Sequence, residues 1–450
     1  MDVTTKLSRF AAETNLEKIP AKVLETAKTA VMDCIGVALA GSKEECAKIC
    51  AEIARQEGAK EEATIIGQGF KSSALHAALA NGTAAHAMDF DHSFTLMGQP
   101  TAPIIPALIS LGDALGASGR RLIEAYVAGY EVTAKLCYSL RESSHDGWHA
   151  PSTLGSFGAT AGCAKLLGLD AGQTEMALGV AASMAGGIVA NFGTMTKPLH
   201  VALGARNGVL AAKLAQSGYT ANAKAIEGEF GFYKNFHPSA PIHDEPLEEL
   251  GKSYALLTDG IRVKPYPCGG LTHQAIDAAL DFRAQHRLTA DMVESIAVDV
   301  TKHTFERIIF RVPQSGIQGK FCMPYLLSRA IIDGRVSLDH FTDAAVRDPN
   351  VLKLAERIQM KLDASLKPID AGARPCRVTV RLKDGQTLTR EVQHAKGGPE
   401  VPMTPGELKG KFIECARQAL NDGATMRALD FIERLETVDN IRPLCQLLTG

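Results

Sequence analysis

Aromatic side chains are scarce in this chain of 450 residues. They make up 6% of the sequence and include a single Trp, whereas Gly occurs 41 times. A β-sandwich core needs bulky alternating side chains, so this composition favours closely packed helices. The chain also carries a net charge of only -2 at pH 7 and has no clustered basic stripe. We therefore expect no nucleic-acid partner.

Long apolar runs and paired cysteines are also missing. No segment stays apolar for about 18 residues without a charge, and the polar N-terminal segment lacks the core of a signal peptide. The 10 cysteines are scattered without a CxxC pair or a repeated spacing. These features predict a soluble cytoplasmic protein with reduced thiols and no membrane partner.

The first 260 residues have the pattern of consecutive helices. Residues 21–41, for example, carry apolar side chains at three- and four-residue spacing and end at Gly41. Many of these helices have Ala/Gly/Ser-rich faces, which let helix axes approach closely. The pattern predicts a large all-helical domain over residues 1–260.

The hydrophobic pattern of the sequence changes near residue 255, from helical spacing to stretches typical of strands. Residues 261–267 and "VESIAVDVTKHTF" (293–305) resemble strands, and "CRVTVRLKDGQTLTREVQ" (376–393) has the pattern of a hairpin with Asp384-Gly385 at its bend. Helical stretches lie between them, so we expect a smaller α+β domain over residues 261–404. Residues 405–450 return to a helical pattern and are expected to pack back on the first domain. The fold class is therefore mainly α.

Several loops between the predicted helices hold polar residues that could carry chemistry. Asp89, Asp91 and Ser93 follow a helix directly. Acids at the C-terminus of a helix oppose its dipole, which suggests a functional purpose. A solvated Asx-turn is the alternative interpretation.

A second loop contains His145, Asp146 and His149. The two histidines could be pictured as metal ligands, but Gly147 and Pro151 break any helix that would align them, and no third ligand follows at a recognised spacing. We favour a catalytic or substrate-holding His149, because imidazole titrates in the useful pH range. A structural histidine is the alternative.

The segment "NFGTMTKPLHVALGARNG" (191–208) places Lys197 before Pro198, in the expected first turn of a helix. A lysine beside helix N-terminal amides creates a positive potential that suits an anionic ligand. The alternative is an ordinary surface lysine.

Two further candidates lie in the predicted α+β domain. Lys264 leads into the stiff Pro265-Tyr266-Pro267 segment, and two glycines then precede a helix with His273 in its first turn. Tyr325 stands beside a proline on an apolar helix, where a core position is the alternative. Taken together, the loops hold two lysines, a histidine and acids without a metal pattern, which suits a small polycarboxylate substrate.

Five segments resemble the MmgE/PrpD family, in order and at similar spacing. They are "HAMDFDHS", "GWHAPSTLGSFGATAGCAKLLGL", "NFGTMTKPLHVALGARNG", "VKPYPCGGLTHQAID" and "GKFCMPYLLSRAIIDG". The family includes 2-methylcitrate dehydratase, cis-aconitate decarboxylase and iminodisuccinate epimerase. The resemblance implies a helical domain with an inserted α/β lid, a site between the two, a homodimer, and no metal or organic cofactor.

The resemblance also implies roles for individual residues. Asp89, His149, Lys197 and Tyr325 match catalytic positions, with His149 or Tyr325 moving a proton. Ser93 and Lys264 match substrate-binding positions, and we expect Gln99 and His273 to bind substrate as well. The two lysines would neutralise substrate carboxylates and stabilise the charge that grows when a proton leaves the adjacent carbon.

One residue departs from the family pattern. The dehydratase-like and decarboxylase-like members carry His-Pro where this chain has Gln99-Pro100. Glutamine can hold a substrate but cannot supply a proton as an acid, so the sequence favours epimerisation of an iminodisuccinate-like diacid. A 2-methylcitrate dehydratase-like or cis-aconitate decarboxylase-like lyase is the alternative, and a non-catalytic helical binding protein is the alternative from another class.

Overall fold

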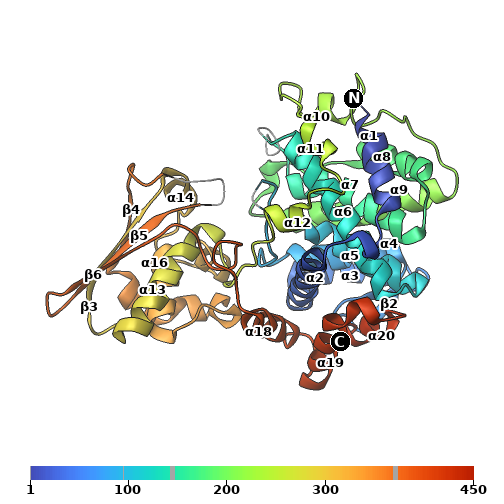
Figure 1. Cartoon of the computed structure of the whole chain (residues 1–450). Coiled ribbons are helices and arrows are strands. Elements are labelled where there is room, and N and C mark those ends of the chain that lie inside the picture. The colour runs from blue at the N-terminus through green and yellow to red at the C-terminus, as the bar shows by residue number, and fades with distance from the viewer. Residues whose placement is uncertain (1, 95, 142–146, 368–372) are drawn as a thin grey trace. The chain divides into compact units, whose positions relative to one another are not determined.

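The computed structural model describes residues 2–94, 96–141, 147–367 and 373–450. The described chain divides into two compact units. Unit 1 comprises Met1–Arg262 and Thr404–Gly450, and unit 2 comprises Val263–Met403. Figure 1 shows helices throughout unit 1 and a sheet with helices in unit 2, which confirms the predicted mainly α fold class.

Unit 1 is a bundle of helices. In chain order its helices are α1 (Val3–Glu13), α2 (Ala21–Gly41), α3 (Glu45–Gln56), α4 (Ala74–His86), α5 (Thr101–Leu115), α6 (Gly119–Ser139), α7 (Ala150–Leu167), α8 (Ala171–Met184), α9 (Thr196–Gln216), α10 (Phe232–Phe236), α11 (Glu245–Glu248), α12 (Ala255–Thr258), α18 (Pro405–Ala416), α19 (Asp422–Glu433) and α20 (Arg442–Leu447). The sequence pattern missed one feature, a hairpin of β1 (Ala63–Ile65) and β2 (Phe70–Ser72). Strands of three residues are too short to show an alternating pattern.

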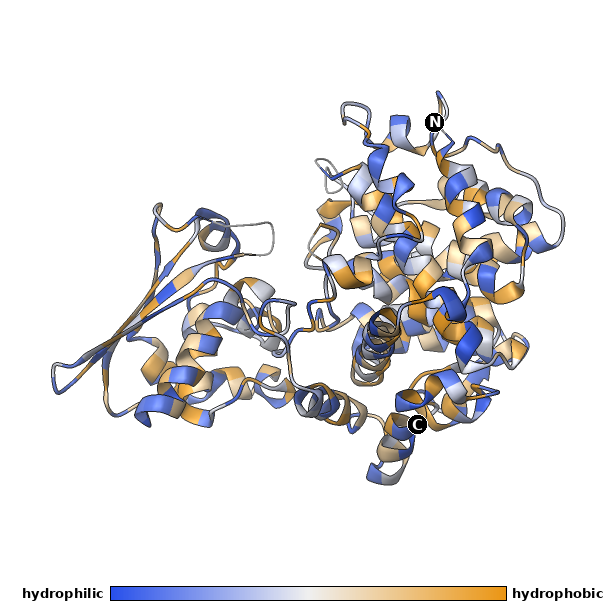
Figure 2. Ribbon diagram, viewed as in Figure 1, coloured by the Kyte–Doolittle hydropathy of each residue, from blue (hydrophilic) through white to orange (hydrophobic). Residues whose placement is uncertain are grey.

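Two helices form the centre of unit 1. Every residue of α5 from Thr101 to Asp113 and of α7 from Ala150 to Ala164 is buried. A helix that is buried on all sides needs a mostly apolar surface, and its polar side chains need internal partners. In α7, for example, the hydroxyls of Ser156 and Thr160 each donate to a backbone carbonyl oxygen four residues earlier at 2.7 Å. Figure 2 shows that hydrophobic and hydrophilic residues alternate along the helices of unit 1 as a whole.

Glycines permit the close helix packing that the composition predicted. A Cβ built on Gly158 of α7 would lie 1.9 Å from Oγ1 of Thr133 and 2.6 Å from the carbonyl oxygen of Gly129, both on α6. A Cβ on Gly208 of α9 would lie 2.5 Å from the Cβ of Ala159 on α7. The axes of α6, α7 and α9 can therefore approach only because these positions lack side chains.

Unit 2 is built on a four-stranded sheet in the order β4-β3-β5-β6. Its strands are β3 (Val293–Val300), β4 (Ile358–Leu362), β5 (Cys376–Leu382) and β6 (Thr387–Val392), and its helices are α13 (His273–His286), α14 (Lys302–Arg307), α15 (Gly316–Gly319), α16 (Met323–Asp333) and α17 (Pro349–Ala355). β3 pairs parallel to β4 and antiparallel to β5. The alternating side chains of β3 and β5 are buried on one face of the sheet only, where they share a core with α13 and α16.

The predicted hairpin is confirmed. β5 and β6 pair antiparallel, and Gly385 at the bend has a φ of 91°, a conformation that glycine adopts without strain. The predicted strand over residues 261–267 is wrong. The described chain there forms only an isolated bridge between Arg262 and Ser93, because Pro265 and Pro267 have no N–H to donate to a ladder.

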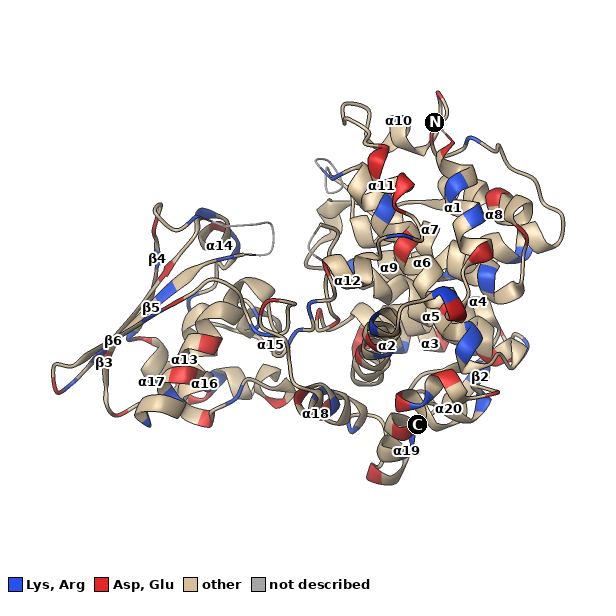
Figure 3. Cartoon of the chain, in the orientation of Figure 1, with Lys and Arg blue, Asp and Glu red and all other residues tan. Residues whose placement is uncertain are grey.

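Acidic and basic residues are interspersed along the chain in both units, as Figure 3 shows. This distribution agrees with the small net charge of the sequence.

We predict that Gly158→Ala destabilises unit 1 by about 2 kcal/mol or more, because the added methyl group has no space between α6 and α7. Gly410→Ala is the matched control. Gly410 lies within α18 with no atom within 4 Å of a built Cβ, so this change should be neutral or stabilise the fold by up to about 1 kcal/mol. Urea denaturation measures both, and equal free energies of unfolding would contradict the packing argument.

Candidate active site

The loop between α4 and α5 carries three of the predicted site residues. Asp89 has a φ of 53°, in the left-handed region that few residues other than glycine adopt. Its Oδ1 atom accepts hydrogen bonds from Nζ of Lys197 at 3.1 Å and from Nε2 of Gln99 at 3.3 Å. Asp89, Gln99 and Lys197 therefore meet at one carboxylate. Ser93, in the same loop, exchanges backbone hydrogen bonds of 3.0 and 2.8 Å with Arg262.

Lys197 lies in the first turn of α9, as its sequence context predicted. Its side chain is only 22% exposed, and Nζ lies 5.7 Å from the ring centroid of Phe192. A cation at a helix N-terminus opposes the helix dipole, and the carboxylate of Asp89 offsets that repulsion. Lys197 is thus a partly buried, ion-paired residue, unlike the solvated surface lysine of the alternative interpretation.

His149 is the residue that precedes α7, and its side chain is buried. Its backbone N–H donates to the carbonyl oxygen of Gly187 at 2.9 Å, and its ring meets that of Phe192 edge to face at 4.9 Å. Burial lowers the pKa of His149 to about 2, and the charges of His86 and Lys197 add to that effect. The imidazole is therefore neutral at pH 7 and has a nitrogen lone pair that can accept a proton.

Two more buried histidines surround His149, and sequence reasoning missed both. The ring centroids of His86 and His200 each lie 5.5 Å from that of His149. Nδ1 of His86 lies 3.0 and 3.2 Å from the two carboxylate oxygens of Asp91. His86 ends α4 among alanines and His200 lies inside α9, so each resembled a core position. Only the packing of α4, α7 and α9 brings the three rings together.

A buried ion pair anchors the loop that carries Asp89. Lys411 of α18 pairs with Asp33 of α2, and its Nζ donates to the carbonyl oxygen of Phe90 at 2.8 Å. Asp33 also accepts from the backbone N–H of His92 at 3.0 Å and lies 2.8 Å from Nδ1 of that ring. Burial alone would raise the pKa of Asp33, but Lys411 and His92 outweigh it and lower the pKa to about 2. The loop is therefore held on both sides of Asp91.

The remaining predicted residues belong to unit 2, and their roles stay predictions. Lys264 is buried, and His273 begins α13 with its Nε2 atom 3.3 Å from the carbonyl oxygen of Cys268. The ring of His273 meets Tyr266 edge to face at 5.2 Å.

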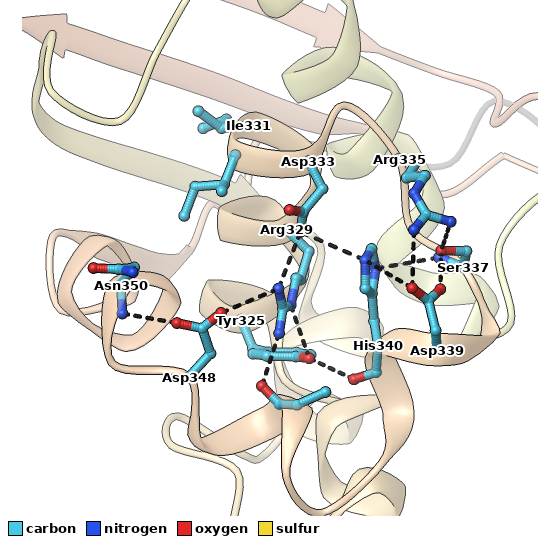
Figure 4. Close-up of polar contacts among 12 residues, drawn as sticks. Tyr325, Arg329, Ile331, Asp333, Arg335, Ser337, Asp339, His340, Asp348 and Asn350 are labelled. Atoms are coloured by element: carbon cyan, nitrogen blue, oxygen red, sulfur yellow. Dashed lines mark hydrogen bonds and ion pairs between the residues drawn. The ribbon is translucent and has the colours of Figure 1, made fainter.

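Tyr325 is fully buried within unit 2 and takes part in a polar cluster (Figure 4). Its hydroxyl donates to the carbonyl oxygen of His340 and accepts from Nε of Arg329 at 3.1 Å. Asp333 and Asp348 hold the same guanidinium at 3.1 and 3.5 Å. Burial raises the pKa of Tyr325, although Arg329 opposes that effect. For Tyr325 to act as a proton donor to a substrate, its hydroxyl would first have to leave the carbonyl of His340.

The sequence raised His145 and His149 as possible metal ligands, and His145 lies outside the described residues. Among the described residues, His86, Asp89 and Asp91 offer ligand atoms within 4.8 Å of one another. Each of the three already has an internal partner, since Asp91 contacts His86 and Asp89 contacts Lys197. The ammonium of Lys197 thus supplies the cation at Asp89.

We predict that the neutral state of His149 makes folding stability depend on pH. Its folded-state pKa lies below the ordinary value of 6.5, so below pH 6.5 the unfolded chain binds a proton that the folded chain does not. Stability should therefore fall from pH 6.5 towards pH 2, by at most about 1.4 kcal/mol per pH unit. Urea denaturation of the wild type and of His149→Asn at pH 7, 6 and 5 measures this. The same pH dependence in both proteins would contradict it.

Comparison with known proteins places the chain in a family. The profile of the MmgE/PrpD N-terminal domain matches residues 5–245, and that of the MmgE/PrpD C-terminal domain matches residues 266–437. No described helix has both the length and the apolar character needed to cross a membrane.

Relatives align along nearly the whole chain. The cis-aconitate decarboxylase of Homo sapiens is 27% identical over 446 residues, which cover 95% of this chain and 91% of the relative. The cis-aconitate decarboxylase of Aspergillus terreus is 25% identical over 475 residues, which cover 99% and 96%. The chain therefore belongs to the MmgE/PrpD family and is an enzyme of the isomerase or lyase type.

Proposed function

We propose that this enzyme moves a proton at a carbon next to a carboxylate of a small di- or tricarboxylate. The observation that carries the proposal is the cluster in which Lys197, Gln99 and Asp89 meet beside the neutral imidazole of His149. A cation and an amide suit the carboxylate of a substrate, and a neutral imidazole suits proton transfer.

Each residue then has a defined task. Lys197 binds a substrate carboxylate and stabilises the negative charge that develops when the adjacent carbon loses a substituent. Asp89 holds Lys197 and Gln99 in place through one oxygen, so the positions of both donors are fixed before substrate binds. His149 accepts the proton, because its imidazole is uncharged. Tyr325, the other candidate base, has its hydroxyl hydrogen-bonded to the carbonyl oxygen of His340 within unit 2.

A lyase reaction is the first candidate. It is supported by relatives that are cis-aconitate decarboxylases and that align with this chain over nearly their full length. In a decarboxylation, the bond between carbon and the carboxylate breaks, carbon dioxide leaves, and the electron pair stays on carbon until a proton, ultimately from water, binds there. Lys197 would stabilise that charge. The comparisons favour this lyase alternative over the epimerase that the sequence suggested.

Epimerisation of an amino-diacid-like substrate is the second candidate, and Gln99 is the specific observation that favours it. Its amide donates to Asp89 and cannot act as an acid, whereas epimerisation needs only removal and return of one proton. The homodimer that the family resemblance implies and the cytoplasmic location expected from the composition both stay predictions.

We predict that the enzyme places deuterium from heavy water on carbon, either by exchange into a candidate substrate or in the product formed from it. Lys197→Ala should slow this at least about 100-fold through loss of charge stabilisation. Mass spectrometry of cis-aconitate, methylcitrate, citrate and iminodisuccinate measures the exchange. Lys213→Ala is the control, because Lys213 ends the same helix and forms a half-exposed pair with Glu62. A Lys197→Ala enzyme as active as the control would remove Lys197 from the site.

The two candidate reactions give different products, which a second experiment separates. We predict that a lyase releases carbon dioxide from carboxyl-labelled cis-aconitate. An epimerase would instead remove the optical activity of iminodisuccinate without releasing carbon dioxide. Gln99→His should raise carbon dioxide release if the missing acid limits decarboxylation. Polycarboxylates that raise the melting temperature while none is exchanged or converted would instead indicate a non-catalytic binding protein.

A further inference from the structure

His149 alone is an incomplete base. Its buried position keeps it neutral, but the same burial makes the imidazolium that forms after proton transfer unfavourable. An effective general base therefore needs a neighbour that stabilises or takes the proton. Two buried histidines, His86 and His200, surround His149. The more exposed ring of Phe192 meets it edge to face, and the charges of Lys197 and Asp89 act on it.

His86 has the hydrogen-bonding state that such a neighbour requires. Asp91 is a carboxylate that can only accept, so Nδ1 of His86 carries the proton that binds it. In neutral His86 the other ring nitrogen, Nε2, then has a free lone pair. His86 and Asp91 are 1% and 2% exposed, and Nε2 of His86 has no hydrogen-bond partner among the described residues. A buried acceptor without a partner is costly unless another group satisfies it.

His149 offers the complementary group. Its Nδ1 atom is buried and has no hydrogen-bond partner in the described part of the chain either. The centroids of the His149 and His86 rings lie 5.5 Å apart, and the rings are inclined by 34°. A small rotation, or one bridging water, would join an N–H at Nδ1 of His149 to Nε2 of His86. That tautomer leaves the lone pair of His149 on its Nε2 atom, ready to accept a proton from substrate.

We propose that Asp91 and His86 form a proton relay with His149, in which they are positioning residues that set its tautomer and take up its proton. Nε2 of His149 accepts the proton from the substrate carbon, and the electron pair stays on that carbon. The proton on Nδ1 of His149 passes to Nε2 of His86, and the resulting imidazolium is paired with Asp91. The steps reverse when the proton returns. This inference rests on the proposed function, since it assigns the relay to the same proton transfer.

The test uses His86→Asn, which can still bond to Asp91 but lacks Nε2, and Asp91→Asn, which removes the charge. Each should lower kcat about 100-fold or more and change KM by less than about threefold, because the groups act on the proton and not on binding. The double variant should be no slower than the slower single variant, because the two residues act as a unit. His76→Asn is the control, since His76 lies near the start of the same helix and should keep wild-type kcat.

A spectroscopic readout separates the relay from a structural role and needs no substrate. Nitrogen-15 NMR of histidine-labelled enzyme should show His149 protonated at Nδ1 in the wild type and shifted towards Nε2 in His86→Asn. Wild-type kcat in His86→Asn, an unchanged His149 tautomer, or a loss found in His200→Asn instead of His86→Asn would each overturn the relay. A wild-type enzyme that neither exchanges nor converts any carboxylate would overturn the proposed function, and the NMR signal would still show whether the histidines are coupled.

Discussion

The buried ion pair between Asp33 and Lys411 is the interaction on which the site depends. Removing two charges from water costs several kcal/mol per ion, and such a pair is tolerated only when further hydrogen bonds satisfy it. Here those bonds come from the carbonyl oxygen of Phe90 and from His92. The ion pair is therefore stable only when the Asp89 loop adopts the conformation that supplies these hydrogen bonds. Because Lys411 is on α18, the C-terminal helices take part in building a site whose other residues lie more than 200 positions earlier.

The second constraint is the balance of charge around His149. Three imidazoles, two carboxylates and one ammonium share a small, mostly buried volume. Each carboxylate has its own partner, Lys197 for Asp89 and His86 for Asp91. In a region of low dielectric constant, a substrate carboxylate that binds Lys197 changes the charge seen by every neighbour. Binding and proton transfer are thus coupled through the same few groups.

Prediction from sequence succeeded where the signal is local. Helical spacing predicted the mainly α class, and the Asp384-Gly385 bend predicted the hairpin, because both depend on residues near one another in the chain. Residues 261–267 were predicted as a strand that follows a turn, but proline has no N–H to donate to a ladder and the segment pairs at a single bridge. Among the predicted site residues, Asp89 and Lys197 were proposed because they are charged residues near loops between apolar helices, and Gln99 because it departs from the family pattern. The structure brings these three side chains together, and their roles stay predictions. His86 and His200 were missed because they lie within helices. A histidine on a helix face of small residues has the same sequence pattern as a residue of the hydrophobic core.

The order of neighbouring side chains thus sets which segments become helices and strands and which loops carry charged groups, and these features can be read from the sequence. The packing of the folded chain sets three further properties: the ammonium of Lys197 bonds to Asp89, His149 is neutral, and Lys411 holds the loop. Those properties depend on burial and on distances between residues 60 to 300 or more positions apart, and no local pattern encodes them.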